Sequence, residues 1–309
     1  MKAQYLRLLR THPRAAAMAY LPIARRCQIR LRIADDHVDV LKDDRAIRIC
    51  HEHQFYLPSI IHEFEFFHSA VEPIHVRGFN IVDYSTPRFH EVKGYVGAPV
   101  LFPALAEPIE TSLQYLRHAQ LSKGSVAIDL GAYSGLTSIL LDRQVGKEGR
   151  VIAVEADRNN LACVKRNLDL HEKLGGRKIE LIHAAIWRTD GDIQFSSEGN
   201  MGSSATSIVG AGRASSTTIP ALTLTSLANQ LNLKRVDFIK CDIEGAEAVI
   251  FDQPRFFQRF QPRMIVEVHP VDGVSTSEAC KAKLGEFGYV CQEFPQVGSD
   301  LPLLECVPG

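Results

Sequence analysis

Short apolar runs alternate with amphipathic stretches from residue 120 to the end of the chain. The runs show little period-two alternation, which is typical of strands that are buried on both faces. Amphipathic segments follow the first two runs, at 135–143 and 159–173. This alternation predicts an α/β domain, with helices on both faces of a parallel sheet. The five runs are 126–130, 150–155, 179–183, 236–241 and 264–268, and we expect 289–293 and 303–307 to add an antiparallel edge.

The first 119 residues have a mixed pattern that predicts a smaller α+β region. Three segments alternate with period two and predict an antiparallel meander. Pro99, Pro103 and Pro108 mark a linker further along. We therefore expect two domains, 1–119 and 120–309. The meander strands are 29–33, 37–41 and 46–50, a further strand is 76–84, and the expected helices are 57–68 and 109–120.

One segment interrupts the regular pattern of the second domain. Residues 196–218 are rich in glycine and serine and lie between the third and fourth apolar runs. Long connections of this kind are usually functional or disordered. We expect this segment to order over the site when ligands bind, as loops that exclude water do.

Composition narrows the class of protein. Of the 309 residues, 45% are hydrophobic and 23% are charged, which suits a globular chain with a sizeable core. The net charge of -1 argues against a general nucleic-acid binder, and no run of 18 apolar residues is present to span a membrane. Seven cysteines without a CxxC pair fit a reducing, cytoplasmic setting. We expect the basic first 34 residues, interrupted by Pro13 and Pro22, to form a surface arm, and His51 and His53 to lie on the surface.

A glycine turn follows the first strand of the second domain. Glycines let the backbone turn sharply and approach a ligand closely. Dinucleotide loops read G-x-G-x-x-G, whereas here Gly131 and Gly135 are separated by three residues and Asp129 precedes them. A carboxylate repels a pyrophosphate but attracts the α-ammonium group of a methionine. The loop therefore predicts S-adenosylmethionine as cofactor rather than a dinucleotide.

Further candidate cofactor residues surround this turn. Glu155 ends the second strand, where an acid accepts both ribose hydroxyls in Rossmann-type sheets. Tyr133 and Ser134 lie inside the turn itself. Ala185 follows the third strand, where we expect the adenine ring.

Acidic side chains and a histidine follow the fourth and fifth strands. Asp242, Glu244 and Glu247 lie within six positions, and Glu267 and His269 face the same way at the end of the next strand. Methyl transfer from a sulfonium needs an acceptor oxygen held in line and its proton removed. We assign these catalytic roles to Asp242, Glu244 and His269, with His269 as the base, whereas Glu247 also suits the first turn of a helix.

The same residues allow a second interpretation, a metal site. Asp242, Glu267 and His269 offer oxygen and nitrogen ligands, and Mg²⁺ prefers a few carboxylates plus water. Catechol O-methyltransferases place acids at comparable strand ends around Mg²⁺, and the chain resembles them only at that level. We favour the metal-independent version, because the fifth strand offers two groups rather than a full ligand set.

Two motifs together resemble the FkbM family of methyltransferases, over roughly residues 120–270. The segment Ile239-Lys-Cys-Asp-Ile-Glu-Gly-Ala-Glu247 is similar to the family's I-K-I-D-x-E-G-A-E, and it follows a D-x-G-A-x-x-G turn. The segments 223–227 and 265–269 also look like the family, while Tyr133-Ser134 departs from its usual Asn-x. The resemblance implies a Rossmann-like class I methyltransferase fold, S-adenosylmethionine as methyl donor and usually O-methylation. Family acceptors are often sugars or polyketide-type metabolites.

Other functions compete with O-methylation of a small molecule. An N-methyltransferase acting on a small amine would use the same cofactor site. Methylation of nucleic acid or protein is disfavoured by the near-neutral charge and by the absence of an Asn-Pro-Pro-Tyr type segment to hold a flipped base. A non-catalytic Rossmann domain that binds nucleosides is disfavoured by the intact Asp129 and Glu155. We therefore expect a small-molecule acceptor and no nucleic acid as partner, and a homo-oligomer stays open.

Overall fold

The computed structural model describes residues 11–196, 204–205, 216–271 and 273–309. The chain divides into two compact units, Met1–Ile109 and Glu110–Gly309. The division lies at Ile109 rather than at residue 119, so helix α6 (Ile109–Ala119) belongs almost wholly to the second unit. The reason is that α6 carries Gln114 and Tyr115, which hydrogen-bond to Gln296 and Glu267 of that unit.

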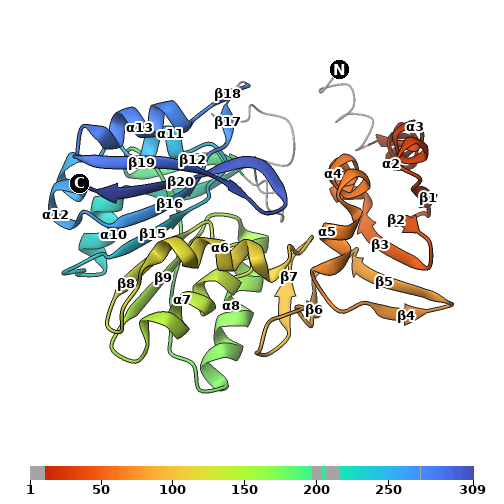
Figure 1. Ribbon diagram of the computed structural model, residues 1–309, viewed down its shortest axis with the longest axis horizontal. Coiled ribbons are helices and arrows are strands. Elements are labelled where there is room, and N and C mark those ends of the chain that lie inside the picture. The colour runs from red at the N-terminus through yellow and green to blue at the C-terminus, as the bar shows by residue number, and fades with distance from the viewer. Residues whose placement is uncertain (1–10, 197–203, 206–215, 272) are drawn as a thin grey trace. The chain divides into compact units, whose positions relative to one another are not determined.

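The first unit contains a five-stranded sheet in the order β1-β2-β3-β5-β4 (Figure 1). Strands β1, β2 and β3 form the expected antiparallel meander. Val38 and Val40 of β2 and Ile47 and Ile49 of β3 are fully buried, whereas β1 has no buried residue. The strands are β1 (Arg30–Ile33), β2 (His37–Lys42), β3 (Arg45–Cys50), β4 (Ile74–Val76) and β5 (Phe79–Tyr84), followed by a hairpin of β6 (Arg88–His90) and β7 (Val100–Phe102).

The helices of the first unit differ from expectation in three places. Pro13 and Pro22 lie in the first turns of two short helices, α2 (Pro13–Met18) and α3 (Leu21–Arg26), where proline is tolerated, instead of ending a helix. The helix expected at 57–68 breaks at Glu63 into α4 (Leu57–His62) and α5 (Phe64–Ser69). His51 and His53 are buried within the 3₁₀ helix η1 (His51–Tyr56), so their expected surface position was wrong.

The second unit is built on a seven-stranded sheet in the order β10-β9-β8-β15-β16-β20-β19. The first five strands in this order run parallel, and β20 pairs antiparallel with both β16 and β19. This confirms the predicted α/β fold with an antiparallel edge. The strands are β8 (Val126–Leu130), β9 (Arg150–Glu155), β10 (Glu180–His183), β15 (Phe238–Cys241), β16 (Arg263–Glu267), β19 (Tyr289–Gln296) and β20 (Ser299–Pro308).

Helices cover both faces of this sheet (Figure 1). Alternate strand residues such as Ile128, Ile239 and Val266 pack into one continuous apolar core with the helices of one face. The intervening residues, among them Asp129 and Lys240, face the other helices. One face carries α6, α7 (Leu136–Val145) and α8 (Arg158–Lys173), and the other carries α10 (Leu224–Gln230), α11 (Glu247–Ile250), α12 (Pro254–Phe260) and α13 (Ser277–Gly285).

Strands flank the glycine- and serine-rich segment. A four-stranded sheet has the order β11-β14-β12-β13, with β12 and β14 paired antiparallel. Residues 197–203 and 206–215 lie outside the described residues, and with them most of the segment that we expect to close over the site. The remaining strands are β11 (Ala185–Ile186), β12 (Gly191–Ser196), β13 (Ser204–Ala205) and β14 (Ser216–Leu222), and a small hairpin joins β17 (Pro270–Val271) and β18 (Val274–Ser275).

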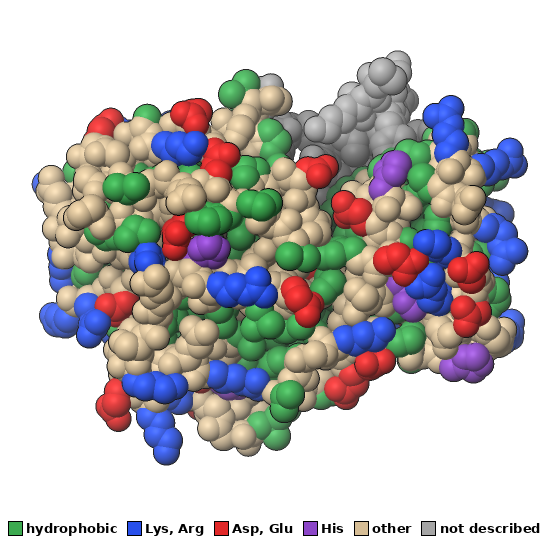
Figure 2. All heavy atoms as spheres, in the orientation of Figure 1, with side chains coloured by type: hydrophobic (Ala, Val, Ile, Leu, Met, Phe, Trp, Pro, Cys, Tyr) green, Lys and Arg blue, Asp and Glu red, His purple; other side chains and the backbone are tan. Residues whose placement is uncertain are grey.

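The surface carries charges of both signs. Figure 2 shows Lys and Arg side chains interspersed with Asp and Glu over the visible face. Across the part of the chain that the structure describes, no helix combines the length and apolar character that crossing a bilayer requires.

Candidate active site

The C-terminal ends of β8, β9, β15 and β16 bring the candidate residues to one edge of the sheet. In open α/β sheets, ligands bind beyond this edge. The β8 and β9 side carries the glycine turn and Glu155, and the β15 and β16 side carries Asp242, Glu244, Glu267 and His269. We call these last four residues the acceptor cluster, because we expect the methyl acceptor to bind there.

Gly131 packs directly against the chain after β15. Its φ angle is +77°, and a Cβ atom built there would lie 1.9 Å from the backbone oxygen of Asp242. A side chain at this position would therefore collide with backbone, which cannot yield as a flexible side chain can. The glycine turn, which we expect to bind the cofactor and call the cofactor turn, therefore contacts the backbone of the acceptor cluster at Asp242.

Replacing Gly131 by alanine should lower the free energy of unfolding by at least the ~1–3 kcal/mol of a strained backbone position. It should also weaken binding of S-adenosylhomocysteine, the product form of the cofactor. Gly175→Ala is the matched control, because Gly175 has φ +92° and nothing within 4 Å of its built Cβ. Chemical denaturation measures the free energy of unfolding of both variants, and the difference between their losses gives the effect of the collision without that of the backbone strain. Equal losses would show that the contact with Asp242 is unimportant for stability.

Glu155 is buried at the end of β9 and is already hydrogen-bonded. Its Oε2 accepts from the backbone N–H of Tyr133 at 2.8 Å, and its Oε1 accepts from that of Asp157 at 2.8 Å. Tyr133 therefore contributes its backbone, held at φ +53°. A carboxylate has about four acceptor sites, so Glu155 retains capacity for the ribose hydroxyls that we expect there. Burial raises the pKa of Glu155 to about 7.

The affinity for S-adenosylhomocysteine should therefore rise with pH through about 7. Hydroxyl donors bind the ionised carboxylate more strongly than the neutral carboxyl group. At a pH one unit below its pKa, a carboxyl group is only about one-tenth ionised, so the affinity should change up to tenfold. Calorimetry at about pH 6 and about pH 8 measures it. Glu155→Gln should bind more weakly and lose this part of the pH dependence. A pH profile that is unchanged in the variant would assign the effect to another group.

The other expected cofactor residues lie near the same turn. Ser134 is buried, and its backbone oxygen accepts from Asn167 of α8 at 2.8 Å. Gly135 precedes α7 and packs towards Val164 of α8. Ala185 begins β11, just beyond the β10 strand that pairs with β9. Their contacts with the cofactor stay predictions.

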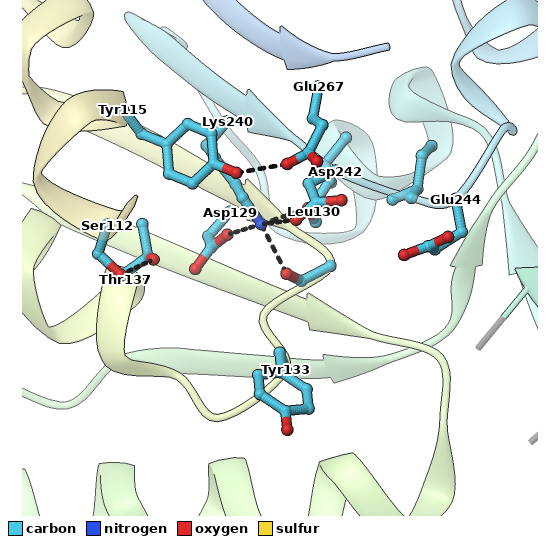
Figure 3. Close-up of polar contacts among 12 residues, drawn as sticks. Ser112, Tyr115, Asp129, Leu130, Tyr133, Thr137, Lys240, Asp242, Glu244 and Glu267 are labelled. Carbon is cyan, nitrogen blue, oxygen red and sulfur yellow. Dashed lines mark hydrogen bonds and ion pairs between the residues drawn. The ribbon is translucent and has the colours of Figure 1, made fainter. Parts of the chain in front are cut away.

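A buried lysine that we did not anticipate stands at the centre of the site (Figure 3). Lys240 pairs with Asp129 in the register of β15 and β8, and its Nζ lies 3.4 Å from Asp129 Oδ1. The ammonium also donates to the backbone oxygens of Leu130, at 3.3 Å, and Gly131, at 2.7 Å. Burial would lower the pKa of Lys240, but Asp242 and Asp129 raise it, so the lysine stays charged.

This lysine changes the expectation for Asp129. The Asp129 side chain is fully enclosed, and its Oδ2 accepts from Ser138 at 2.6 Å. Burial raises its pKa, against the opposing effect of Lys240. Direct contact with the α-ammonium of the cofactor stays a prediction, but the described structure already supplies Asp129 with a cation. The Oδ1 atom is buried and faces Lys240 Nζ at 3.4 Å, without a hydrogen bond among the described residues.

Lys240 also connects the cofactor turn to the acceptor cluster. Its Nζ lies 3.4 Å from Asp242 Oδ2, and it stands 5.5 Å from the centre of the Tyr115 ring. The Tyr115 hydroxyl donates to Glu267 Oε2 at 2.7 Å (Figure 3). Helix α6 thus contributes a hydrogen bond to the acceptor cluster through Tyr115.

His269 lies among four carboxylates. Its Nδ1 is 3.1 Å from Glu247 Oε1, and its Nε2 is 3.7–3.8 Å from oxygens of Asp242, Glu244 and Glu267. Burial would lower the pKa of His269, but Glu244, Glu247 and Asp242 raise it well above its ordinary value. Burial raises the pKa of Glu244 to about 8. These acids favour a protonated ring, which opposes the role of base that we assigned to His269. The sequence does not show how many acids surround the ring.

Two residues of this site, Lys240 and Tyr115, were missed by sequence reasoning, and so was the contact of Glu247 with His269. A charged residue inside the apolar run 236–241 was a usable signal for Lys240, because a buried lysine requires a partner. Tyr115 gave no signal, since it lies far from β16 in the sequence. Glu247 was assigned to a helix start, and it does begin α11.

The fold, the glycine turn and the acidic strand ends define a class I S-adenosylmethionine-dependent methyltransferase. The family model of the methyltransferase FkbM domain matches residues 129–297, more than half of the chain. The chain therefore belongs to the FkbM methyltransferase family. None of the curated proteins compared with the chain matches it.

Several solved structures of methyltransferases are similar to part of the chain at low identity. An FkbM methyltransferase from Methylobacillus flagellatus KT is 19% identical, covering 63% of this chain and 47% of that chain, with a TM-score of 0.45. A precorrin-6y C5,15-methyltransferase from Geobacter metallireducens GS-15 is 16% identical, covering 64% and 87%, with a TM-score of 0.40. An O-methyltransferase from Bacillus cereus in complex with S-adenosylhomocysteine is 16% identical, covering 66% and 82%, with a TM-score of 0.39.

Proposed function

We propose that this methyltransferase acts on a hydroxyl group of a small molecule, such as a sugar, a glycan or a secondary metabolite. The observation that carries the proposal is the acceptor cluster, which lies directly beside the cofactor turn through the Gly131–Asp242 contact and Lys240. Carboxylates and an imidazole orient a hydroxyl by accepting its hydrogen bond.

The residues of the chain hold the two reactants and receive the proton. Glu155 and the backbone of the glycine turn hold the cofactor, and the acceptor cluster holds the hydroxyl in line. S-adenosylmethionine supplies the methyl group, whose carbon bonds to the acceptor oxygen while sulfur keeps the electron pair of the broken C–S bond. The hydroxyl proton passes to the acceptor cluster and from there to water.

A small acceptor suits this site better than a nucleic acid. The net charge is -1, and the visible face carries both signs of charge intermixed (Figure 2). Phosphate backbones select basic surfaces. The acidic acceptor cluster would also repel a phosphate brought close to the methyl group.

The test compares matched acceptors that differ at one functional group. Release of S-adenosylhomocysteine is measured with glycosides, phenols and polyketide alcohols, each beside its deoxy analogue and its amine analogue. Turnover with a hydroxyl compound and none with its deoxy partner supports the proposal. Turnover with amines alone would replace it by N-methylation, and cofactor binding without turnover on any acceptor of the panel would favour a non-catalytic domain.

A further inference from the structure

Three carboxylates converge on one imidazole nitrogen without hydrogen-bonding to it. His269 Nε2 lies 3.7 Å from Asp242 Oδ1, 3.7 Å from Glu244 Oε1 and 3.8 Å from Glu267 Oε1. These separations exceed hydrogen-bond distances. Ligand atoms of Asp242, Glu244 and His269 all lie within 4.8 Å of one another, as ligands around one ion do.

The histidine is nine-tenths buried and is oriented by a buried acid. The His269 side chain is 10% exposed, and its Nδ1 contacts Oε1 of Glu247, which is fully buried. When Nδ1–H donates to a carboxylate, the lone pair of Nε2 points the other way. This carboxylate–histidine pairing is the arrangement that fixes metal-bound histidines in one orientation. Here Nε2 lies 3.7 Å from an oxygen of Asp242 and 3.7 Å from an oxygen of Glu244.

Glu267 is engaged differently from the other two carboxylates. Its Oε2 accepts from the Tyr115 hydroxyl at 2.7 Å, so one of its oxygens is held away from the cluster. Lys240 contacts Asp242 but shares its charge with Asp129.

We propose that Asp242, Glu244 and His269 bind a divalent cation, with Glu247 as the residue that orients His269. Two carboxylates and one imidazole suit Mn²⁺ or Mg²⁺ completed by water, with Zn²⁺ as the competing ion. This ligand set differs from the one expected from the sequence, since Glu244 takes the place of Glu267, and it reverses the metal-independent preference. The cation's role rests on the proposed function: it would hold the acceptor oxygen and make its proton easier to remove.

The test measures cation binding directly on the metal-stripped full chain. Titration with Mn²⁺, followed by the loss of its free electron paramagnetic resonance signal, should show one ion per chain, displaced by Mg²⁺. Glu247→Gln should weaken Mn²⁺ binding about 10- to 100-fold, and Asp242→Asn and Glu244→Gln by at least as much. Glu278→Gln, at an acid that is 85% exposed and outside the cluster, is the control and should bind as wild type does.

S-adenosylhomocysteine affinity, measured in parallel, confirms that each variant is folded. The proposal is overturned if the wild type takes up none of Mn²⁺, Mg²⁺ and Zn²⁺, or if Asp242→Asn and Glu244→Gln bind Mn²⁺ as tightly as the wild type. Full methyl transfer after chelation would exclude a role for the cation in the reaction and leave the proposed function intact. Mn²⁺ binding without transfer to any hydroxyl would keep the cation site and remove the proposed function.

Discussion

Replacing His269 by alanine should lower the rate of methyl transfer about 100- to 10,000-fold, the range that a positioned proton-transfer group contributes. The affinity for S-adenosylhomocysteine should stay close to that of the wild type. The imidazole lies on the acceptor side, 3.7 Å from both Asp242 and Glu244, whereas Gly131 and Glu155 lie on the cofactor side. Its loss is expected to disable the acceptor cluster whether the charged ring orients the carboxylates around it or the ring holds a cation.

Steady-state kinetics with one acceptor, together with calorimetry, separates the two sides of the site. His75→Ala is the matched control, because His75 is exposed and belongs to the first unit. A His269→Ala variant with wild-type turnover would contradict the assignment of the acceptor side. A variant that loses cofactor affinity and turnover together would place His269 in cofactor binding instead.

Replacing Lys240 by methionine should destabilise the second unit by about 3–5 kcal/mol, the cost of leaving one partner of a buried ion pair uncompensated. Asp129 is fully buried and Lys240 is 4% exposed, so water cannot replace the lost ammonium. The two backbone oxygens of the glycine turn would also lose their donor. We expect weaker S-adenosylhomocysteine binding as a consequence.

A double variant tests whether the loss comes from the pair. Asp129→Asn removes the unpaired charge, so Lys240→Met with Asp129→Asn should be less destabilised than the sum of the single variants. Lys165→Met is the control, since its pair with Asp169 is exposed and worth at most ~1 kcal/mol. Denaturant titration of the wild type, the two single variants and the double variant gives the coupling free energy between Lys240 and Asp129. Strictly additive losses of stability would mean that Lys240 does not act through Asp129.

Much of the second unit could be predicted from the sequence because its strands are short apolar runs. All five parallel strands, and the antiparallel pair β19 and β20, lie where those runs stand. The strands β12 and β14 were not predicted, because glycine and serine dominate between them and β14 begins with three polar residues and contains Pro220. The helix break at Glu63 was hidden as well, since Ile60, Ile61, Phe64 and Phe67 are all buried as a single helix would bury them.

Single residues of the site could be predicted from the sequence, but the contacts between them could not. The strand ends indicated Asp129, Glu155, Asp242 and His269, since polar residues that end buried strands stand out. The pairing of Lys240 with Asp129 depends on the register of two strands that lie far apart in the sequence. The carboxylates around His269 come from two strand ends and a helix start, and only the folded chain shows that they surround one ring.

Methyl transfer with S-adenosylmethionine labelled with ¹³C in its methyl group tests the central claim most directly. The reaction is run with an acceptor that carries both a hydroxyl and an amine, and the product is examined by ¹³C nuclear magnetic resonance. The account predicts that the labelled carbon is bonded to oxygen. A label found on nitrogen or on carbon, with the hydroxyl unchanged, would contradict it.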